Sequence, residues 1–225
     1  MPQSLRISRP FRGCVAKIET VRDMTLPIKP SRMGFLLTGG KSSRMGTNTD
    51  KAFLDFRGQT LLDRALSVMG AVCGSVAIVG DPAKFTQYGP AIADIFPGCG
   101  PLAGIHAALL HSTADLNLML AVDMPFVSRE LLSFLFAAAA DEDNDAIVTV
   151  PRTSKGFQPL CAIYRRGFSP AAEQALRTGK YKIDAAFSKV SVRVIEDTEL
   201  AAAGFSERNF FNVNTPQDRR AAFGA

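Results

Sequence analysis

The sequence predicts an α/β domain built on a mostly parallel β-sheet. The chain has 225 residues, of which 47% are apolar and 21% charged, and this balance is typical of one globular domain with a substantial core. From Gly34 onward, short apolar runs alternate with segments of helical periodicity, which is the pattern of consecutive βα units. The longest purely apolar stretches, Leu118–Val122 and Phe134–Ala140 among them, are far shorter than the ~20 residues that cross a bilayer, so we expect no membrane partner.

Seven apolar runs have the character of strands, and five longer segments have that of helices. Ser128 before an apolar run and Pro216 after Thr215 are typical helix starts. Because helices between parallel strands cover both faces of a sheet, we expect a single three-layer α/β/α domain. The predicted strands are Phe35–Leu37, Val76–Val79, Ala91–Ile95, Leu116–Val122, Ala146–Val150, Leu160–Tyr164 and Val192–Ile195. The predicted helices are Thr60–Cys73, Pro101–His111, Ser128–Ala140, Ser169–Leu176 and Thr215–Ala222.

Residues 1–32 differ from the rest in charge and pattern. They carry seven Lys and Arg against two acidic residues, which leaves 19 of the 26 basic and 19 of the 21 acidic residues for 33–225. A neutral body with a basic leader lacks the one-sided positive charge of a nucleic-acid binder, so we expect no nucleic-acid partner. Because the leader contains four prolines and no sustained periodicity, we expect 1–32 to be flexible and 33–225 to form the folded domain.

The cysteines and histidines do not form a zinc pattern. The four cysteines are widely spaced with no C-x-x-C pair, and the two histidines, His106 and His111, fall in one predicted helix. Scattered cysteines without a secretory signal are typical of a reducing cytoplasm, which is the expected location.

A glycine-rich segment with two cations follows the first predicted strand. Gly39 and Gly40 let the backbone approach a ligand and expose N–H groups to anionic oxygens, while Arg44 and Lys51 add positive charge. A P-loop would need glycine at position 35, which is Phe35, and G-x-G-x-x-G is absent. The segment therefore predicts a phosphate site of another kind.

Two further positions follow predicted strands, where ligands bind in open parallel sheets. Asp123 directly follows the most apolar run of the chain, and a carboxylate there is suited to hold Mg²⁺ against phosphate oxygens. A turn or helix-cap aspartate is the alternative reading. The segment Gly98–Gly104 enters a helix at Pro101 and either recognises a base or ribose or is only a tight turn.

Covalent catalysis is not indicated, because the sequence has no G-x-S-x-G elbow and both histidines lie in one helix. The class of reaction that remains is phosphoryl or nucleotidyl transfer, in which the enzyme positions the substrates and stabilises charge.

The motifs together resemble one known family, the molybdenum cofactor guanylyltransferases or MobA family. The resemblance covers about residues 34–222 and is carried by L-x-G-G-x-S-x-R-M-G-x-x-x-D-K over 37–51, G-P-L-A-G over 100–104, D-M-P over 123–125 and N-V-N-T-P over 212–216. Thr38 stands where the family usually has alanine, and no role is assigned to Val79, where some relatives have an asparagine-bearing strand end.

The resemblance implies a nucleotide-diphosphosugar-transferase-like, Rossmann-like fold and transfer of GMP from GTP to the terminal phosphate of the molybdenum-loaded molybdopterin, with Mg²⁺ as cofactor and pyrophosphate as product. It implies that Lys51, Asp123 and Arg44 assist catalysis and that Asp123 binds the metal. The residues implied for GTP are Leu37, Thr38, Gly39, Gly40, Lys51, Asp94 and Asp123.

Three residues are candidates for the pterin. Asn212 and Asn214 have amides that can pair with its donors and acceptors, although capping of the last helix explains at least one of them equally well. Lys182 matches a basic position of the family. A recipient molybdoenzyme or a dedicated chaperone is a further expected partner.

Three alternatives stay open at this point. A cytidylyltransferase for the same cofactor and a sugar-1-phosphate nucleotidyltransferase would share the fold, and Gly39 favours guanine over cytosine within the family pattern. A non-catalytic cofactor carrier is the more remote alternative, and the presence of both Lys51 and Asp123 disfavours it.

Overall fold

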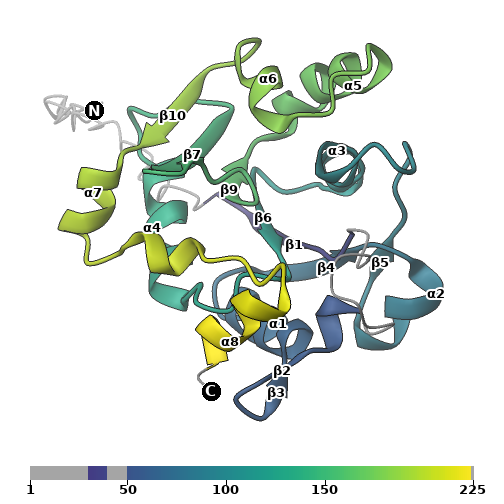
Figure 1. Cartoon of the computed structure of the whole chain (residues 1–225). Helices are drawn as coiled ribbons and strands as arrows, with labels where there is room; N and C mark the ends of the chain where they lie inside the picture. Colours follow the sequence, from purple (N-terminus) through teal and green to yellow (C-terminus); the bar gives the residue numbers. More distant parts are fainter. Residues whose placement is uncertain (1–29, 40–49, 224–225) are drawn as a thin grey trace, which may run out of the picture.

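A computed structural model describes residues 30–39 and 50–223. A central sheet runs between two helical layers, with the strand order β10-β7-β9-β6-β1-β4-β5 (Figure 1). The strands are β1 (Arg32–Leu37), β4 (Ser75–Val79), β5 (Ala91–Ile92), β6 (Leu116–Ala121), β7 (Val148–Thr153), β9 (Cys161–Tyr164) and β10 (Val192–Ile195). Two short hairpins add β2 (Asp55–Phe56) with β3 (Gln59–Thr60), and β8 (Gly156–Phe157) against the end of β7.

The sheet is parallel except at β9 and β8. Strands β6, β1, β4 and β5 pair in parallel, as do β7 and β10, whereas β9 runs antiparallel to both β6 and β7. The carboxyl ends of β1, β4 and β6 therefore meet at one edge, where β1 pairs in register with both neighbours from Met33 to Leu37. This confirms the predicted α/β architecture with a mostly parallel sheet.

Alternate residues of the central strands face opposite helical layers, as the two-residue period of a strand requires. Leu36, Ile78 and Leu118 pack in the cluster that includes α1 (Leu61–Gly70) and α4 (Arg129–Ala139). Phe35 and Met119 pack in the opposite cluster with α3 (Pro101–His111), α5 (Ser169–Arg177) and α6 (Ile183–Phe187). The predicted three layers are thus present (Figure 1).

Several predicted element boundaries differ from the structure. The strand predicted over Ala91–Ile95 ends at Ile92, because its neighbour β4 ends at Val79 and supplies no further partners, and Ile95 is 55% exposed. The strand predicted over Ala146–Val150 is shifted to Val148–Thr153, where β8 and β10 pair with it. The remaining helices are α2 (Pro82–Phe85), α7 (Asp197–Ala202) and α8 (Pro216–Phe223), with 3₁₀ turns η2 (Lys51–Phe53), η3 (Thr86–Tyr88), η4 (Arg166–Phe168) and η5 (Glu207–Phe210).

Helix starts follow the caps predicted from sequence. The Ser128 hydroxyl accepts from the backbone N–H of Leu131, and the Thr215 hydroxyl accepts from that of Asp218 at the start of α8. Residues 1–29 of the predicted leader lie outside the described residues. Ser31 ties the entry to β1, since its N–H and hydroxyl donate to Asp115 at 2.8 and 2.7 Å.

Helix α3 packs on the sheet through Gly104. A Cβ at Gly104 would be 2.7 Å from Leu37 Cδ2 and 3.3 Å from Val79 Cγ1, so a larger residue there would force the buried Leu37 side chain to move. This packing brings the N-terminus of α3 to the carboxyl ends of β1 and β4. In the described part of the chain, helices are too short or too polar to span a bilayer.

Candidate functional site

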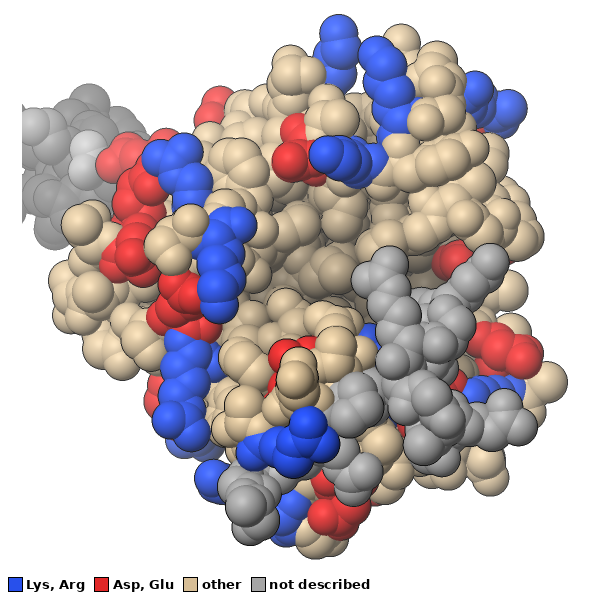
Figure 2. All heavy atoms as spheres, in the orientation of Figure 1, with Lys and Arg blue, Asp and Glu red and all other residues tan. Residues whose placement is uncertain are grey.

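A cavity of about 800 Å³ opens at the carboxyl ends of β1, β4 and β6. Figure 2 shows it as a hollow in the centre of the face, walled largely by uncharged residues. Its size is that of a nucleotide-scale ligand site. The described residues that line it are Leu37, Thr38, Gly39, Asp50, Lys51, Val79, Asp94, Gly98, Gly100, Pro101, Gly104, Ala121, Val122, Asp123, Leu160, Asn212 and Asn214.

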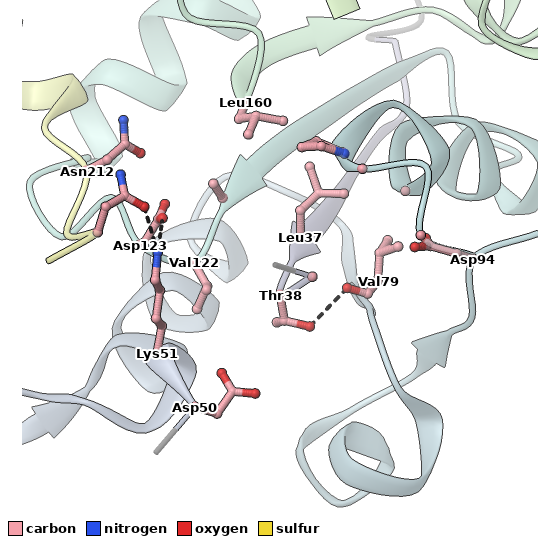
Figure 3. A pocket seen from close by; sticks show the side chains of 17 residues that line it. Leu37, Thr38, Asp50, Lys51, Val79, Asp94, Val122, Asp123, Leu160 and Asn212 are labelled. Carbon is pink, nitrogen blue, oxygen red and sulfur yellow. Dashed lines mark hydrogen bonds and ion pairs between the residues drawn. The ribbon is translucent and has the colours of Figure 1, made fainter. Parts of the chain in front are cut away.

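The segment after β1 forms one wall and is held by backbone contacts. The N–H and hydroxyl of Thr38 both donate to the Val79 carbonyl at 3.0 Å, and the Leu37 carbonyl accepts from Val122 N–H at 3.1 Å (Figure 3). Among the described residues, no neighbouring heavy atom lies within 4 Å of where a Cβ of Gly39 would stand. Leu37, Thr38 and Gly39 therefore line the cavity, and their contact with a nucleotide stays a prediction. Val79, to which no role was assigned, lines the same cavity and orients Thr38 through its carbonyl, a main-chain role that its residue type does not signal.

Lys51 enters the cavity from η2, and Asp50 determines where that turn begins. The Asp50 carboxylate accepts from the Ala52 N–H at 2.9 Å through one oxygen and pairs with the Lys84 ammonium through the other. This cap places Lys51 at the first residue of the turn. Lys84, on α2, also lies over the ring of Phe53, 5.5 Å from its centre, so this cation is anchored beside the site.

Lys51, Asp123 and Asn214 meet at one end of the cavity. Lys51 Nζ lies 2.6 Å from Asn214 Oδ1, to which it donates, and 3.6 Å from Asp123 Oδ2 (Figure 3). The Lys51 and Asp123 side chains are 20% and 18% exposed, so each is accessible only from the cavity side. An ammonium and a carboxylate presented together in this way can bind a metal-chelated polyphosphate.

The electrostatics of Asp123 are set by burial. Burial raises the pKa of its carboxyl above the ordinary value, and the Lys51 ammonium opposes that rise. Its backbone is held as well, because the Asp123 carbonyl accepts from Val213 N–H at 2.9 Å. That bond connects the end of β6 to the C-terminal segment and brings Asn214 beside Lys51.

The opposite end of the cavity contains Asp94 and the start of α3 (Figure 3). Asp94 Oδ1 is buried and has no hydrogen-bond partner among the described residues, and burial raises the pKa of this carboxyl. Gly98 and Gly100 have φ angles of +78° and +77°, which L side chains rarely adopt, and they shape the turn that leads into Pro101. The free Asp94 oxygen can accept hydrogen bonds, and the N–H groups at the start of α3 can donate them. Together they suit a polar, flat ligand such as a nucleobase.

The donor set fits a magnesium ion that is shared with a substrate. In the described ranges, no three His, Cys, Asp or Glu side chains form a dedicated metal cluster. Mg²⁺ commonly takes one or two carboxylates and completes its shell with phosphate oxygens and water. Asp123 is such a carboxylate. Burial disfavours its negatively charged form, and a bound cation would stabilise that form.

The other predicted site residues divide into three groups. Gly40 and Arg44 lie outside the described residues. Lys182 is exposed just before α6 and is not among the described residues that line the cavity, so its pterin role stays a prediction. Asn212 and Asn214 both line the cavity. The hydroxyl of Thr215 caps α8, and the side chain of Asn214 accepts a hydrogen bond from Lys51 rather than capping that helix.

The described histidines and cysteines are not among the residues that line this cavity. His106, on the buried side of α3, is 2% exposed, and neither ring nitrogen has a hydrogen-bond partner among the described residues. Cys73, Cys99 and Cys161 are free thiols.

Comparison with known proteins agrees with this geometry. The family described as MobA-like NTP transferase domain matches residues 34–194. A probable molybdenum cofactor guanylyltransferase of Pelotomaculum thermopropionicum is 36% identical over 187 residues, which cover 82% of this chain and 88% of the relative. A protein with the same description from Clostridium perfringens is 32% identical over 183 residues, covering 80% and 90%.

A solved structure shows the same fold. Molybdopterin-guanine dinucleotide biosynthesis protein A from Archaeoglobus fulgidus superposes with a TM-score of 0.73 at 27% identity, covering 85% of this chain and 96% of that one. The motifs, the fold and the matched range all agree, and the chain belongs to the MobA-like NTP transferase family.

Proposed function

We propose that the chain transfers GMP from GTP to the molybdenum cofactor, giving molybdopterin guanine dinucleotide and pyrophosphate. An oxygen of the acceptor's terminal phosphate forms a bond to the α-phosphorus of GTP. The bond from that phosphorus to the bridging oxygen of the β-phosphate breaks, and pyrophosphate leaves with the electron pair.

The observation that carries this proposal is the meeting of Lys51 and Asp123, 3.6 Å apart, at one end of a nucleotide-sized cavity. These two groups can neutralise and position a triphosphate, and nucleotidyl transfer depends mainly on such positioning. The names of the similar proteins from P. thermopropionicum and C. perfringens support GTP and the molybdenum cofactor as the substrate pair.

Each residue has a distinct role in this reaction. Asp123 would hold Mg²⁺, which would withdraw charge from the phosphate oxygens. Lys51 donates to the oxygens on which charge builds as pyrophosphate leaves. Leu37, Thr38 and Gly39 present backbone to the nucleotide, and Asp94 receives N–H donors of the base at the far end. Arg44 is proposed to assist Lys51 on the phosphates.

Pyrophosphate release tests the proposal. Purified protein with Mg²⁺ and molybdenum-loaded molybdopterin is assayed with GTP, CTP, ATP and UTP in parallel. We expect release with GTP, and we expect Lys51→Ala and Asp123→Ala each to reduce it about 100-fold or more, because each removes a charge aimed at the reacting phosphates. Lys189→Ala and Asp143→Ala, which alter exposed residues, are the matched controls and should retain full activity.

The alternatives give different results in the same assay. Preference for CTP would assign the chain to the cytidylyl branch, and release with a sugar 1-phosphate as acceptor would identify a sugar nucleotidyltransferase. Tight binding of nucleotide without release under any of these conditions would reject the enzyme and favour a carrier.

A further inference from the structure

A second cavity of about 380 Å³ adjoins the first one. The two share Asn212 and Asn214, and Asn214 is the residue that accepts the hydrogen bond from Lys51. The second cavity therefore begins at the reacting end of the nucleotide site, on the side away from Asp94 (Figure 3). A group bound there would lie next to the phosphates and opposite the base.

The walls of the second cavity suit a flat heterocycle. Phe157 and Phe211 both line it, and each ring is braced by a further ring, Phe187 at 5.6 Å and Phe126 at 6.1 Å between centres. Aromatic rings held in fixed orientations favour stacking on planar ligands.

Two amides of the second cavity have acceptor oxygens to spare. Gln158 donates through Nε2 to Thr153 Oγ1 at 3.0 Å and to the Gly156 carbonyl at 3.3 Å, and Asn212 donates to the Phe210 carbonyl at 3.3 Å. Within the described chain no hydrogen bond reaches the oxygen of either amide. Both oxygens can accept from N–H groups of a nitrogen-rich ring.

An ion pair lies at the edge of the same cavity. Lys155 Nζ is 2.6 Å from Glu207 Oε1, and Glu207 Oε2 accepts from the Ser154 hydroxyl at 2.5 Å. The side chain of Lys155 is 70% exposed and that of Glu207 36%, so the pair contributes little stability and can be exchanged. Figure 2 shows basic side chains beside the hollow on the side where Figure 1 places β7.

Asn212 and Asn214, the amides expected to contact the pterin, both line this second cavity. We propose that Lys155 exchanges Glu207 for a negative charge of the acceptor when the acceptor occupies it. The proposal rests on the function proposed above and assigns Lys155 and Glu207 opposite effects: Lys155 attracts the acceptor and Glu207 competes with it. The amide oxygens of Gln158 and Asn212 and the rings of Phe157 and Phe211 bind the heterocycle. Lys155 attracts a negatively charged group of the same acceptor.

The proposal predicts changes of opposite direction in acceptor affinity for variants of Lys155 and Glu207. We expect Lys155→Ala to weaken acceptor binding about tenfold and Glu207→Gln to strengthen it about threefold, because the second change frees the ammonium. The KM for GTP should stay unchanged in both variants. Arg177→Ala, which breaks an exposed ion pair with Glu173 of similar exposure and 2.7 Å separation, is the matched control and should change neither constant.

The measurement combines acceptor binding with steady-state kinetics. Binding of molybdenum-loaded molybdopterin is followed by pterin fluorescence without any nucleotide, so it does not depend on turnover. If both variants weaken binding, the pair only fixes the β7–β8 hairpin to η5 and the proposal is overturned; unchanged binding in both overturns it as well. Absence of pyrophosphate release from the wild type, with the opposite shifts in binding intact, would instead reject the proposed function and leave this site standing.

Discussion

Asn214 accepts a hydrogen bond from Lys51 at 2.6 Å, although the two residues are 163 positions apart in the chain. The bond makes the C-terminal segment part of the reacting end of the cavity. It also gives Asn214 a role that neither helix capping nor contact with the pterin describes.

Asn214 should therefore act through Lys51. We expect Asn214→Ala to lower kcat for pyrophosphate release about tenfold, because the ammonium loses the partner that orients it toward the phosphates. In a Lys51→Ala background the same change should have no further effect, since residues that act as one unit are not additive. Gln174→Ala, which removes an exposed amide on α5 that lines neither cavity, is the matched control for kcat. Additive losses in the double variant would show that Asn214 acts independently of Lys51.

The ionisation of Asp123 should depend on Lys51. Burial raises the pKa of Asp123 and the Lys51 ammonium lowers it, so we expect Lys51→Met to raise that pKa further. The carboxyl carbon resonance, titrated by NMR in the metal-free protein, reports the change. Asp115, whose pKa is lowered by hydrogen bonds from Ser31, should titrate identically in both proteins. A fall in the Asp123 pKa on removal of Lys51 would contradict the pairing.

Asp94 should reduce stability at neutral pH. Burial raises the pKa of Asp94 in the folded protein above its ordinary value of 3.8. Between pH 3.8 and that raised pKa, the native state holds more protons than the unfolded state, so stability falls as pH rises. We expect Asp94→Asn to raise Tm at pH 7 and to leave it unchanged below about pH 3.8. Thermal unfolding across this pH range, with Asp143→Asn as the exposed control, measures the effect. An equal rise in Tm at all pH values would indicate that charge is not the cause.

Gly104 should be required for the packing of α3 on the sheet. We expect Gly104→Ala to cost about 1–3 kcal/mol of unfolding free energy, because its Cβ would meet buried Leu37 and Val79 side chains. Gly70→Ala is the contrasting control, since no neighbouring heavy atom of the described residues lies within 4 Å of a Cβ there, and it should stabilise α1 by no more than about 1 kcal/mol. Denaturant unfolding of the three proteins compares them, and equal stabilities would refute the close approach.

Much of the fold follows from local pattern. The alternation of apolar runs and helical segments predicted the parallel sheet, and Ser128 and Pro216 marked the starts of α4 and α8 as predicted. Asp123 was identified because it follows the most apolar run, and the end of a buried parallel strand is where a ligand site forms. The predictions of strands and helix starts succeeded because strand period and capping depend on residues that are near one another in the chain.

The partners within the site could not be predicted in that way. That Asn214 contacts Lys51, that the Val79 carbonyl holds Thr38 and that Lys84 pairs with Asp50 all depend on how separate segments pack against the sheet edge. The composition and order of the residues determined the fold class, the family resemblance and the charges available for catalysis. Tertiary structure alone decided which of those charges and amides meet, because the contacts join segments tens to more than a hundred residues apart, and side-chain type carries no record of spatial neighbours.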